Sequence, residues 1–174
     1  MKFNFIATTF RYHEESLIDE LKDLFYEFED LSVIFNQTNI DGIIVGTCLK
    51  DPIDFVLFLR NKIKNVPWEI RYLLRFIPIE KVILTDIIKI KEVSQFLMSK
   101  IPSDATFKIV IEKRHTSLKK IDIINEIAPL ISTKVDLDHP SWVLLIEILG
   151  KYSGISVLKS NVLFSSMIEK RLSE

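Results

Sequence analysis

The first 78 residues alternate between short apolar runs typical of strands and longer segments with helical periodicity, and no other feature constrains the fold more. Phe3–Phe10 is rich in aromatic and apolar residues and lacks a breaker, so it predicts a strand. In Glu14–Phe28, leucine and phenylalanine recur at helical spacing and form one apolar face, which predicts a helix. Glu14 and Glu15 favour the N-terminus of this helix, because acidic side chains offset the positive end of the helix dipole.

Two more strands, a second helix and a further strand continue the alternation. We expect them at Leu31–Phe35, Ile43–Leu49, Pro52–Lys64 (the helix) and Trp68–Ile77. The segment 36–42 between the two strands is rich in turn-forming residues and predicts a hairpin. Asp51 before Pro52 is typical of a helix N-terminus. The resulting order, β-α-β-β-α-β, is that of a ferredoxin-like domain.

After Pro78 the pattern changes, and we place the boundary there, with one domain at residues 1–80 and a second at residues 81–174. Thr85 or Asp86 is a suitable cap for a helix that runs to Ser99. The remainder predicts a strand, a helix, a turn and two strands at Phe107–Ile111, Leu118–Ile131, Val135–Pro140, Ser141–Leu149 and Ile155–Leu158. The expected fold class is α+β, with an N-terminal ferredoxin-like domain followed by a second small domain.

Several sequence features bear on location. Apolar runs such as Phe55–Leu59 and Val143–Ile146 are far shorter than the roughly 20 residues that a membrane-spanning helix needs. The segment after Met1 lacks a long apolar core with a cleavage site, so we expect no signal peptide. Cys48 is the only cysteine, which excludes an internal disulfide and a cysteine-based metal cage. We therefore expect a cytoplasmic protein that has no membrane association.

Charge is distributed unevenly along the chain. Residues 1–60 contain 11 acidic and 5 basic residues, whereas residues 61–174 contain 13 acidic and 18 basic residues. This asymmetry suggests a polyanionic partner for the second half. The isoelectric point near 6.3 argues against an indiscriminate nucleic-acid binder.

Side chains typical of a catalytic centre are scarce. There is no glycine-rich phosphate-binding loop, and Cys48 lies in an apolar segment, as a packed thiol does. Asp136, Asp138 and His139 offer three potential metal ligands, but they lie in a turn beside Pro140, where aspartate is common. We expect no enzyme activity, no cofactor and no metal. A small enzyme that holds a metal at these three residues is an alternative.

A run of basic residues marks the second half. Three of them close a predicted strand, two open the next predicted helix, and two more are expected nearby. The set is Lys108, Lys113, Arg114, His115, Lys119, Lys120 and Lys134. Positive side chains beside the free N–H groups of a helix N-terminus suit phosphate oxygens. The alternative is an ordinary solvated loop, because most charge runs are simply exposed surface.

Several segments of the second half, taken in order, resemble the THUMP domain. Thr106–His115 is similar to the THUMP strand that leads into a loop rich in lysine and arginine, and residues 122–131 lie where that family has its next helix. Residues 135–158 resemble its closing segment, which has a V-D-L-x-x-P motif, an apolar strand, a turn and an S-V pair. Arg71–Ile79 resembles one subfamily, the THUMP adaptors of tRNA cytidine acetylation, which carry a similar run ahead of their THUMP helices.

The resemblance covers residues 69–164 and implies a THUMP domain beside a ferredoxin-like domain, which together grip the acceptor end of tRNA. It further implies a partner enzyme, the tRNA cytidine acetyltransferase. The chain ends soon after the last predicted strand, so we expect the chemistry to come from that separate protein. The N-terminal half is acidic and the chain is shorter than those adaptors, which leaves a stand-alone RNA-binding protein or chaperone as the alternative.

Arg71 and Arg75 join the basic run as expected RNA contacts. On a strand, a spacing of four residues places both side chains on one face, and the segment lies next to the domain boundary. The alternative role for these two arginines is to pair with acidic residues and hold the domains together.

Overall fold

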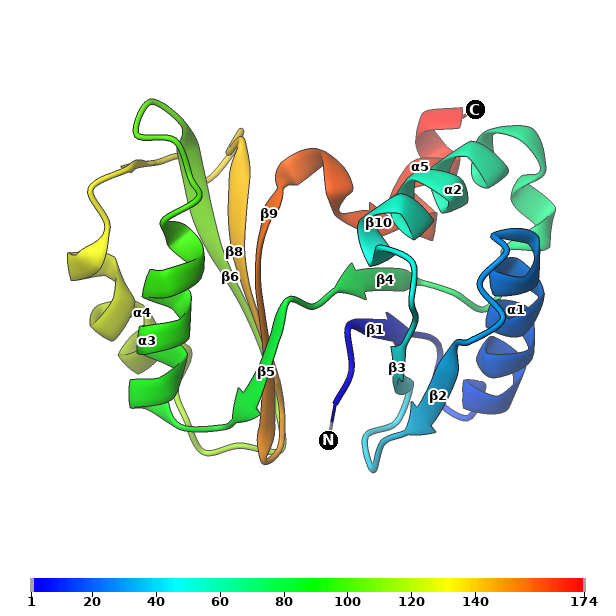
Figure 1. Cartoon of the computed structure of the whole chain (residues 1–174), viewed down its shortest axis with the longest axis horizontal. Coiled ribbons are helices and arrows are strands. Elements are labelled where there is room, and N and C mark those ends of the chain that lie inside the picture. Colours follow the sequence, from blue (N-terminus) through cyan, green and yellow to red (C-terminus); the bar gives the residue numbers. More distant parts are fainter. Residues whose placement is uncertain (1, 174) are drawn as a thin grey trace. The chain divides into compact units, whose positions relative to one another are not determined.

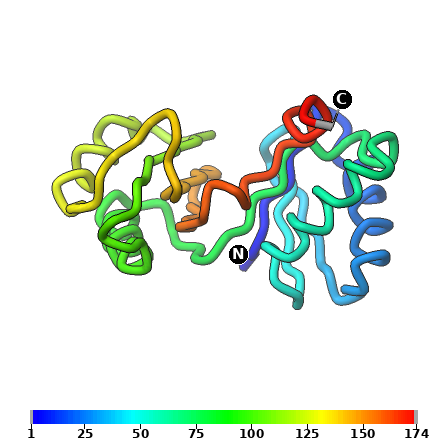
Figure 2. The backbone as a smooth tube through the Cα atoms, turned by 90° about the horizontal axis from the view of Figure 1, so that it is seen from above, coloured from blue at the N-terminus to red at the C-terminus, as the bar shows by residue number. Residues whose placement is uncertain are grey.

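The computed structural model describes residues 2–173 and divides the chain into two compact units (Figure 1). The first unit contains residues 2–78 together with the C-terminal residues from Val162, and the second contains residues 79–161. Figure 2 shows the last segment of the chain lying among the elements of the first unit. Each unit has its own sheet and its own apolar core.

The first unit is a five-stranded antiparallel sheet in the order β10-β4-β1-β3-β2. The elements are β1 (Phe5–Thr8), α1 (Glu14–Glu27), β2 (Ile34–Gln37), β3 (Ile43–Thr47), α2 (Pro52–Asn65), β4 (Arg75–Pro78), β10 (Phe164–Ser165) and α5 (Ser166–Ser173). The order β-α-β-β-α-β expected for residues 1–78 is thus observed. Asp51 caps α2, because its carboxylate accepts a hydrogen bond from the Ile53 N–H at 2.8 Å.

The expected strand Trp68–Ile77 is wrong in its first half. Pro67–Glu69 forms a 3₁₀ turn (η1), and β4 begins only at Arg75. The physical reason is a carboxylate on α1: Glu20 accepts hydrogen bonds from the backbone N–H groups of residues 71, 72 and 73 at 2.7 to 3.2 Å. Those three N–H groups are therefore unavailable to a neighbouring strand.

Phenylalanine rings fill the core between the sheet and helices α1 and α2. The rings of Phe25 on α1 and Phe55 on α2 stack with centroids 3.9 Å apart, and those of Phe5 and Phe76 on adjacent strands with centroids 4.9 Å apart. A β-carbon at Gly46 would approach the Phe5 ring to 2.1 Å, so this close packing needs glycine there. Each such ring, once fully buried, contributes about 1.5–3 kcal/mol of hydrophobic free energy.

Residues 162–173 differ from expectation, since the sequence placed them in a second domain of residues 81–174. β10 pairs with β4 through Phe164 and Phe76, and Phe164 is buried in the first core. Arg60 on α2 donates to the carboxylate of Glu169 on α5 at 2.7 Å and to the Leu163 carbonyl at 2.7 Å. These contacts join segments about a hundred residues apart, so no local pattern predicts them.

The second unit is a five-stranded sheet in the order β5-β9-β8-β6-β7, with α3 and α4 on one face (Figure 1). β6 is parallel to β8 and β7, and the other pairs are antiparallel. The elements are β5 (Lys81–Leu84), α3 (Ile87–Met98), β6 (Thr106–Arg114), α4 (Lys120–Ile127), the 3₁₀ turn η2 (Ala128–Leu130), β7 (Lys134–Val135), β8 (Trp142–Leu149), β9 (Tyr152–Lys159) and the 3₁₀ turn η3 (Ser160–Val162).

Three predictions for this unit need correction. β5 was not predicted, and it exists because it pairs with β9. β6 continues three residues beyond the expected end at Ile111, because β8 pairs with it as far as Arg114. The helix expected at Leu118–Ile131 is shorter at both ends, and a 3₁₀ turn follows it at Pro129. Within residues 2–173, no helix combines the length and the apolar character that crossing a membrane requires.

Candidate nucleic-acid interface

One end of the second sheet gathers strand ends and helix starts. β6 and β8 run parallel, so their C-terminal ends lie together, and α3 and α4 begin at this same end. The Gly150 N–H donates to the Arg114 carbonyl at 2.9 Å, and the Thr85 N–H donates to the Lys151 carbonyl at 2.8 Å. These bonds tie the β6 end, the β8–β9 turn and the start of α3 to one another. In open α/β sheets, ligands commonly bind at the C-terminal ends of the strands.

Basic side chains lie at the end of β6, at the start of α4 and at the β8–β9 turn. We call the group Lys113, His115, Lys119, Lys120 and Lys151 the strand-end surface. All five residues are exposed, and Lys119 is the N-cap residue of α4, where no side chain caps the first turn. Free N–H groups at a helix start and nearby ammonium groups both favour negative oxygen atoms.

Backbone conformation brings Lys151 into the strand-end surface. His115 and Gly150 both have left-handed backbones, with φ of 53° and 62°. At Gly150 this conformation allows the tight turn between β8 and β9, and a β-carbon there would lie 3.9 Å from His115. Lys151 could not be predicted from local sequence, because only the hairpin pairing of β8 with β9 carries it to the end of β6.

Two members of the predicted basic set are engaged by acidic side chains. The ammonium group of Lys120 lies 3.7 Å from the Glu112 carboxylate, and both side chains are more than 40% exposed. This ion pair therefore contributes little to the stability of the fold. Arg114 differs. Its Nη1 donates at 2.9 Å to the carboxylate of Glu147 on β8, a side chain that is only 1% exposed.

The expectation that Arg114 leaves the sheet together with its neighbours is therefore corrected. Arg114 lies within β6, and its guanidinium group is turned toward a buried carboxylate. Because a buried carboxylate needs a paired charge, the first role of Arg114 is inside the unit. Its contact with RNA stays a prediction.

Lys108 and Lys134 lie toward the other end of β6. Lys134 on β7 pairs with Thr106 at the start of β6, and Lys108 is two residues further along. Arg114 lies six residues after Lys108 along the strand, which corresponds to roughly 20 Å. The single basic edge that the sequence predicts is thus divided between the two ends of β6.

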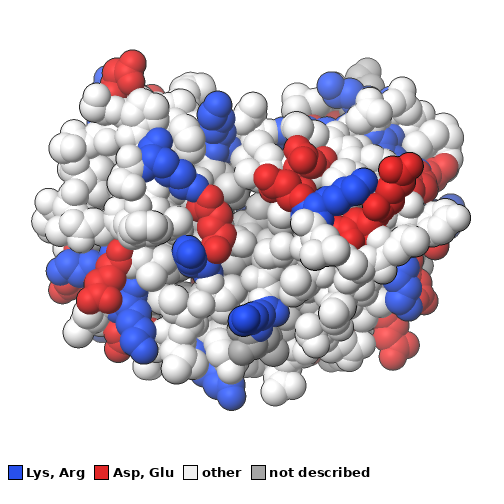
Figure 3. All heavy atoms as spheres, viewed as in Figure 1, with Lys and Arg blue, Asp and Glu red and all other residues white. Residues whose placement is uncertain are grey.

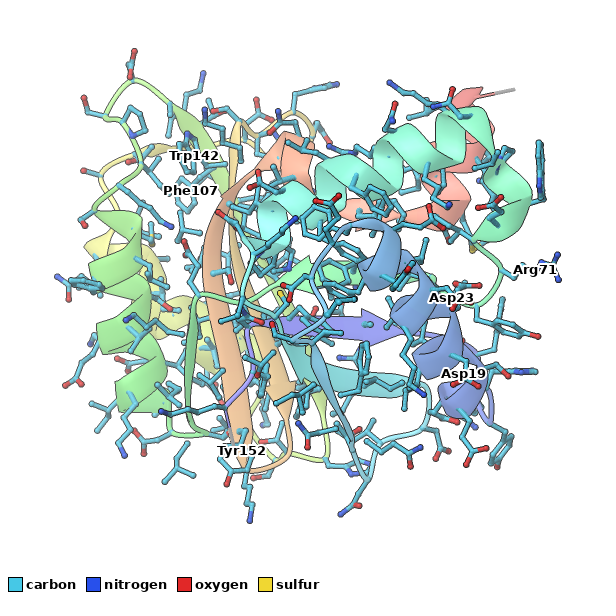
Figure 4. The ribbon with its side chains drawn as sticks, turned by 45° about the vertical axis from the view of Figure 1, so that its right-hand side comes forward. Asp19, Asp23, Arg71, Phe107, Trp142 and Tyr152 are labelled. Atoms are coloured by element: carbon cyan, nitrogen blue, oxygen red, sulfur yellow. The ribbon has the colours of Figure 1, made fainter. Side chains whose placement is uncertain are left out.

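Arg71 and Arg75 do not share a strand face. Arg71 precedes β4, its Nε donates to the Trp68 carbonyl at 3.1 Å, and Figure 4 shows its side chain extending outward from the first unit. Arg75 is the first residue of β4 and is half-buried. The two side chains are not on one strand face because Glu20 holds residues 71–73 out of the sheet.

Three acidic residues of the first unit, Glu14, Glu20 and Asp30, bind its backbone. Glu20 binds the backbone of residues 71–73, and Glu14 accepts a hydrogen bond from the Gly42 N–H. Burial alone would raise the pKa of Asp30, but hydrogen bonds from Ser32 and from the backbone of Lys50 and Leu49 outweigh it and lower that pKa. These carboxylates serve the fold, so the acidic composition of this unit does not by itself indicate a partner.

Other acidic residues remain on the surface. Glu15, Asp19, Asp23 and Glu27 recur at every fourth position of α1, and the labelled Asp19 and Asp23 project from this helix in Figure 4. The second unit contains 12 Lys and Arg against 10 Asp and Glu, a net charge of +2, and the rest of the chain contains 11 against 14. Figure 3 shows both signs interspersed on the visible face of each unit.

The three potential metal ligands form a turn instead. The Asp136 carboxylate accepts hydrogen bonds from the backbone N–H of Asp138 at 3.1 Å and of His139 at 2.9 Å. The bond from His139 is the main reason that the pKa of Asp136 is lowered. Among residues 2–173, no three His, Cys, Asp or Glu side chains are grouped closely enough to hold a metal ion. Asp136 thus acts as a turn residue.

Comparison with known proteins identifies the second unit. Residues 85–158 match the family model of the THUMP domain. THUMP domain-containing protein 1 of Mus musculus is 31% identical over 115 residues, and the match covers 61% of this chain and 33% of that protein. The Homo sapiens protein of the same name matches equally well. The chain therefore spans about one third of the length of these relatives.

Solved structures show the same fold over both units. The crystal structure of PH1313 from Pyrococcus horikoshii has a TM-score of 0.62 at 14% identity, and the match covers 91% of this chain and 55% of the PH1313 chain. A 4-thiouridine synthetase in complex with RNA and ATP has a TM-score of 0.51 at 18% identity, and the match covers 90% of this chain and 41% of the synthetase chain. At such identities the likeness is one of fold, whereas the family match and the relatives identify residues 85–158 of this chain as a THUMP domain.

Proposed function

We propose that this protein is a tRNA-binding adaptor, which holds the acceptor end of tRNA and presents it to a separate modifying enzyme. One observation carries the proposal: a THUMP domain whose strand-end surface brings lysines from three chain segments beside the uncapped start of α4. Ammonium groups and free backbone N–H groups at one place bind phosphate oxygens without reading base sequence. The solved structure of a 4-thiouridine synthetase bound to RNA shares this fold, which supports an RNA ligand.

The first unit supports the same proposal. Its strand order β4-β1-β3-β2, entirely antiparallel, and its element order are those of a ferredoxin-like domain, and we propose that it is one. The expected partner is the tRNA cytidine acetyltransferase, from the resemblance of Arg71–Ile79 to the adaptors of that enzyme. In this proposal the protein has no catalytic centre of its own and works in the cytoplasm.

The tRNA contact is tested by binding at increasing salt concentration. With about four to six neutralised phosphates, the log–log slope of affinity against salt is expected to be roughly −3 to −5. The variant Lys113→Glu with Lys119→Glu should reduce the magnitude of that slope by about two and weaken binding, without changing the melting temperature. The matched control reverses two exposed charges on the first unit, Lys64→Glu with Arg171→Glu. A flat salt response, or equal losses in both variants, would reject the strand-end surface as the contact.

The adaptor role is tested separately with the purified acetyltransferase, tRNA and this protein. Formation of 4-acetylcytidine should depend on the protein and should fall in the Lys113→Glu, Lys119→Glu variant. If the enzyme modifies tRNA equally well without the protein while tRNA binding persists, the protein is a stand-alone RNA-binding protein instead.

A further inference from the structure

The loop between β1 and α1 exposes aromatic rings that lie outside the core of the first unit (Figure 1). The side chains of Phe10 and Tyr12 are 53% and 84% exposed. Arg11 between them and His13 after them are also exposed. Four consecutive residues thus present three rings and a guanidinium group to solvent, and the loop exposes no aliphatic side chain among them.

A ring from a second segment of the first unit joins this group. The centroid of the His13 ring lies 6.4 Å from that of Phe10 and 5.5 Å from that of Tyr72, which precedes β4. Such distances are typical of aromatic pairs. His13 is the N-cap residue of α1, but its side chain makes no capping hydrogen bond. We call Phe10, Tyr12, His13 and Tyr72 the ring cluster.

Backbone hydrogen bonds fix the segments that carry the ring cluster. The Thr9 N–H donates to the Gly42 carbonyl at 2.9 Å, and the His13 N–H donates to the Phe10 carbonyl at 3.2 Å. A carboxylate of α1 accepts a hydrogen bond from the backbone N–H of Tyr72. The backbone that carries the rings is therefore positioned before a ligand arrives, which reduces the entropy lost on binding.

Tyr12 combines a strained backbone with an exposed ring. Its φ of 66° lies in the left-handed region, which is unfavourable for a bulky residue because of its β-carbon. Glycine has no β-carbon and adopts this φ without strain. Because the Tyr12 ring is 84% exposed, its burial does not offset the strain. Strained positions of this kind cluster at ligand-binding sites.

The charges around the ring cluster balance. Arg11 and Arg71 adjoin its rings along the chain, and Glu15 and Asp41 are exposed close to the same two turns. The carboxylate of Glu14 is occupied by a backbone N–H. A basic peptide is opposed by the two arginines, and the phosphates of an RNA duplex are opposed by the exposed carboxylates and by the acidic residues along α1.

An uncharged planar ligand meets neither of these repulsions. Nucleobases are such ligands, and they stack on aromatic rings and on the plane of an arginine. Each stacked base needs only one ring. The faces of the bases in a duplex are covered by their neighbours in the stack, so a surface that binds through rings selects unpaired nucleotides.

We propose that the ring cluster binds unpaired RNA bases by stacking, with Arg11 at the base or at the phosphate of the same nucleotide. The choice of RNA as the source of the bases rests on the proposed function. The two RNA contacts then differ in chemistry, because the strand-end surface of the THUMP domain binds phosphates and the ring cluster binds base faces.

Fluorescence of 2-aminopurine measures stacking directly, because this adenine analogue loses fluorescence when it stacks on a ring. The probe is a single-stranded RNA of about ten nucleotides that contains one 2-aminopurine, a length within the range of single-strand sites. The full chain should quench this probe as it binds. The same strand paired with its complement should bind more weakly to the ring cluster, so its affinity should not depend on the rings.

Replacement of two rings tests the cluster. Phe10→Ala with Tyr12→Ala should reduce the quenching and weaken single-strand binding about tenfold, which corresponds to the loss of roughly one stacked base. The matched control, Phe96→Ala with Tyr26→Ala, removes the same two ring types from positions that are 68% and 71% exposed, and it should bind normally. Both variants should keep the melting temperature. Tyr12→Trp should retain the affinity, because it supplies another ring.

Salt dependence separates the two contacts. Stacking releases no counterions, so the ring variant should keep the log–log slope of affinity against salt, whereas Lys113→Glu with Lys119→Glu reduces its magnitude by about two. Unaltered quenching and affinity in the ring variant, or an equal loss in the matched control, overturn the ring cluster as a base site.

Two further outcomes have distinct meanings. Normal RNA binding by the ring variant, together with lost binding to the acetyltransferase, would assign the ring cluster to a protein partner and overturn the proposal. Failure of the unsubstituted protein to bind tRNA would instead overturn the proposed function. The failure of the ring cluster and the failure of the proposed function are therefore distinguishable.

Discussion

Replacement of Arg114 by methionine tests whether this residue serves the fold or the RNA. The substitution keeps most of the aliphatic stem and removes the guanidinium group, whose Nη1 lies 2.9 Å from the Glu147 carboxylate. Glu147 is 1% exposed and Arg114 is 28% exposed. The variant therefore leaves a buried carboxylate without its arginine partner.

The expected loss of stability follows from that burial. Removing one member of a fully buried ion pair costs about 3–5 kcal/mol. Water reaches the arginine side of this pair, so we expect a loss of about 2–3 kcal/mol. For a chain of this size, each kcal/mol lowers the melting temperature by about 2–4 °C, which predicts a fall of roughly 5–10 °C.

Calorimetry of a double-mutant cycle measures this coupling. The cycle consists of Arg114→Met, Glu147→Gln and the combined variant. The combined variant should be more stable than the sum of the two single losses predicts. The tRNA affinity of Arg114→Met, measured below the melting temperature of the variant, should fall by no more than the loss of one phosphate contact would cause. An unchanged melting temperature together with a large loss of tRNA affinity would refute the reasoning and return Arg114 to the RNA interface.

Three further predictions concern the first unit. Glu20→Gln should lower the free energy of unfolding by about 1–3 kcal/mol in urea, because an amide cannot accept all three backbone N–H bonds, whereas exposed Glu15→Gln should not. Burial raises the pKa of the Cys48 thiol to about 12 from its ordinary value near 9. The buried thiol therefore contributes fully to the free energy of unfolding below pH 9, and this contribution is lost as the pH rises toward 12. The Cys48→Ala variant should not show this loss of stability. Truncation after Asn161 removes Phe164 from the core, and hydrogen exchange should accelerate in β4 and α2 but not in β8; equal rates in β4 before and after truncation would contradict this role.

Several regular elements of this protein follow from local sequence. Helical spacing of leucine and phenylalanine defines α1, and Asp51 with Pro52 sets the start of α2, because both signals act within a few residues of the chain. The ordered motifs between residues 106 and 158 likewise indicate the THUMP domain, which the family match confirms.

The candidate site depended much more on tertiary structure. Glu147 interrupts the apolar strand Trp142–Leu149 and signals a buried charge, but only the pairing of β6 with β8 shows that its partner is Arg114. The pairing of β8 with β9 likewise brings Lys151 to the strand-end surface. Residues that are distant in sequence meet through hydrogen-bonded strands and burial, and a local pattern carries no information about such meetings.

Long-range contacts also explain the position of the C-terminal segment. The sequence predicts no element after Leu158, and only the structure shows the short helix Ser166–Ser173. The burial of Phe164 and the ion pair between Arg60 and Glu169 fix α5 against α2, and this attachment turns Met167, Ile168 and Leu172 outward. Local periodicity determined helices such as α1 and α2, whereas long-range pairing produced β5 and β10 and decided which surfaces remain available for function.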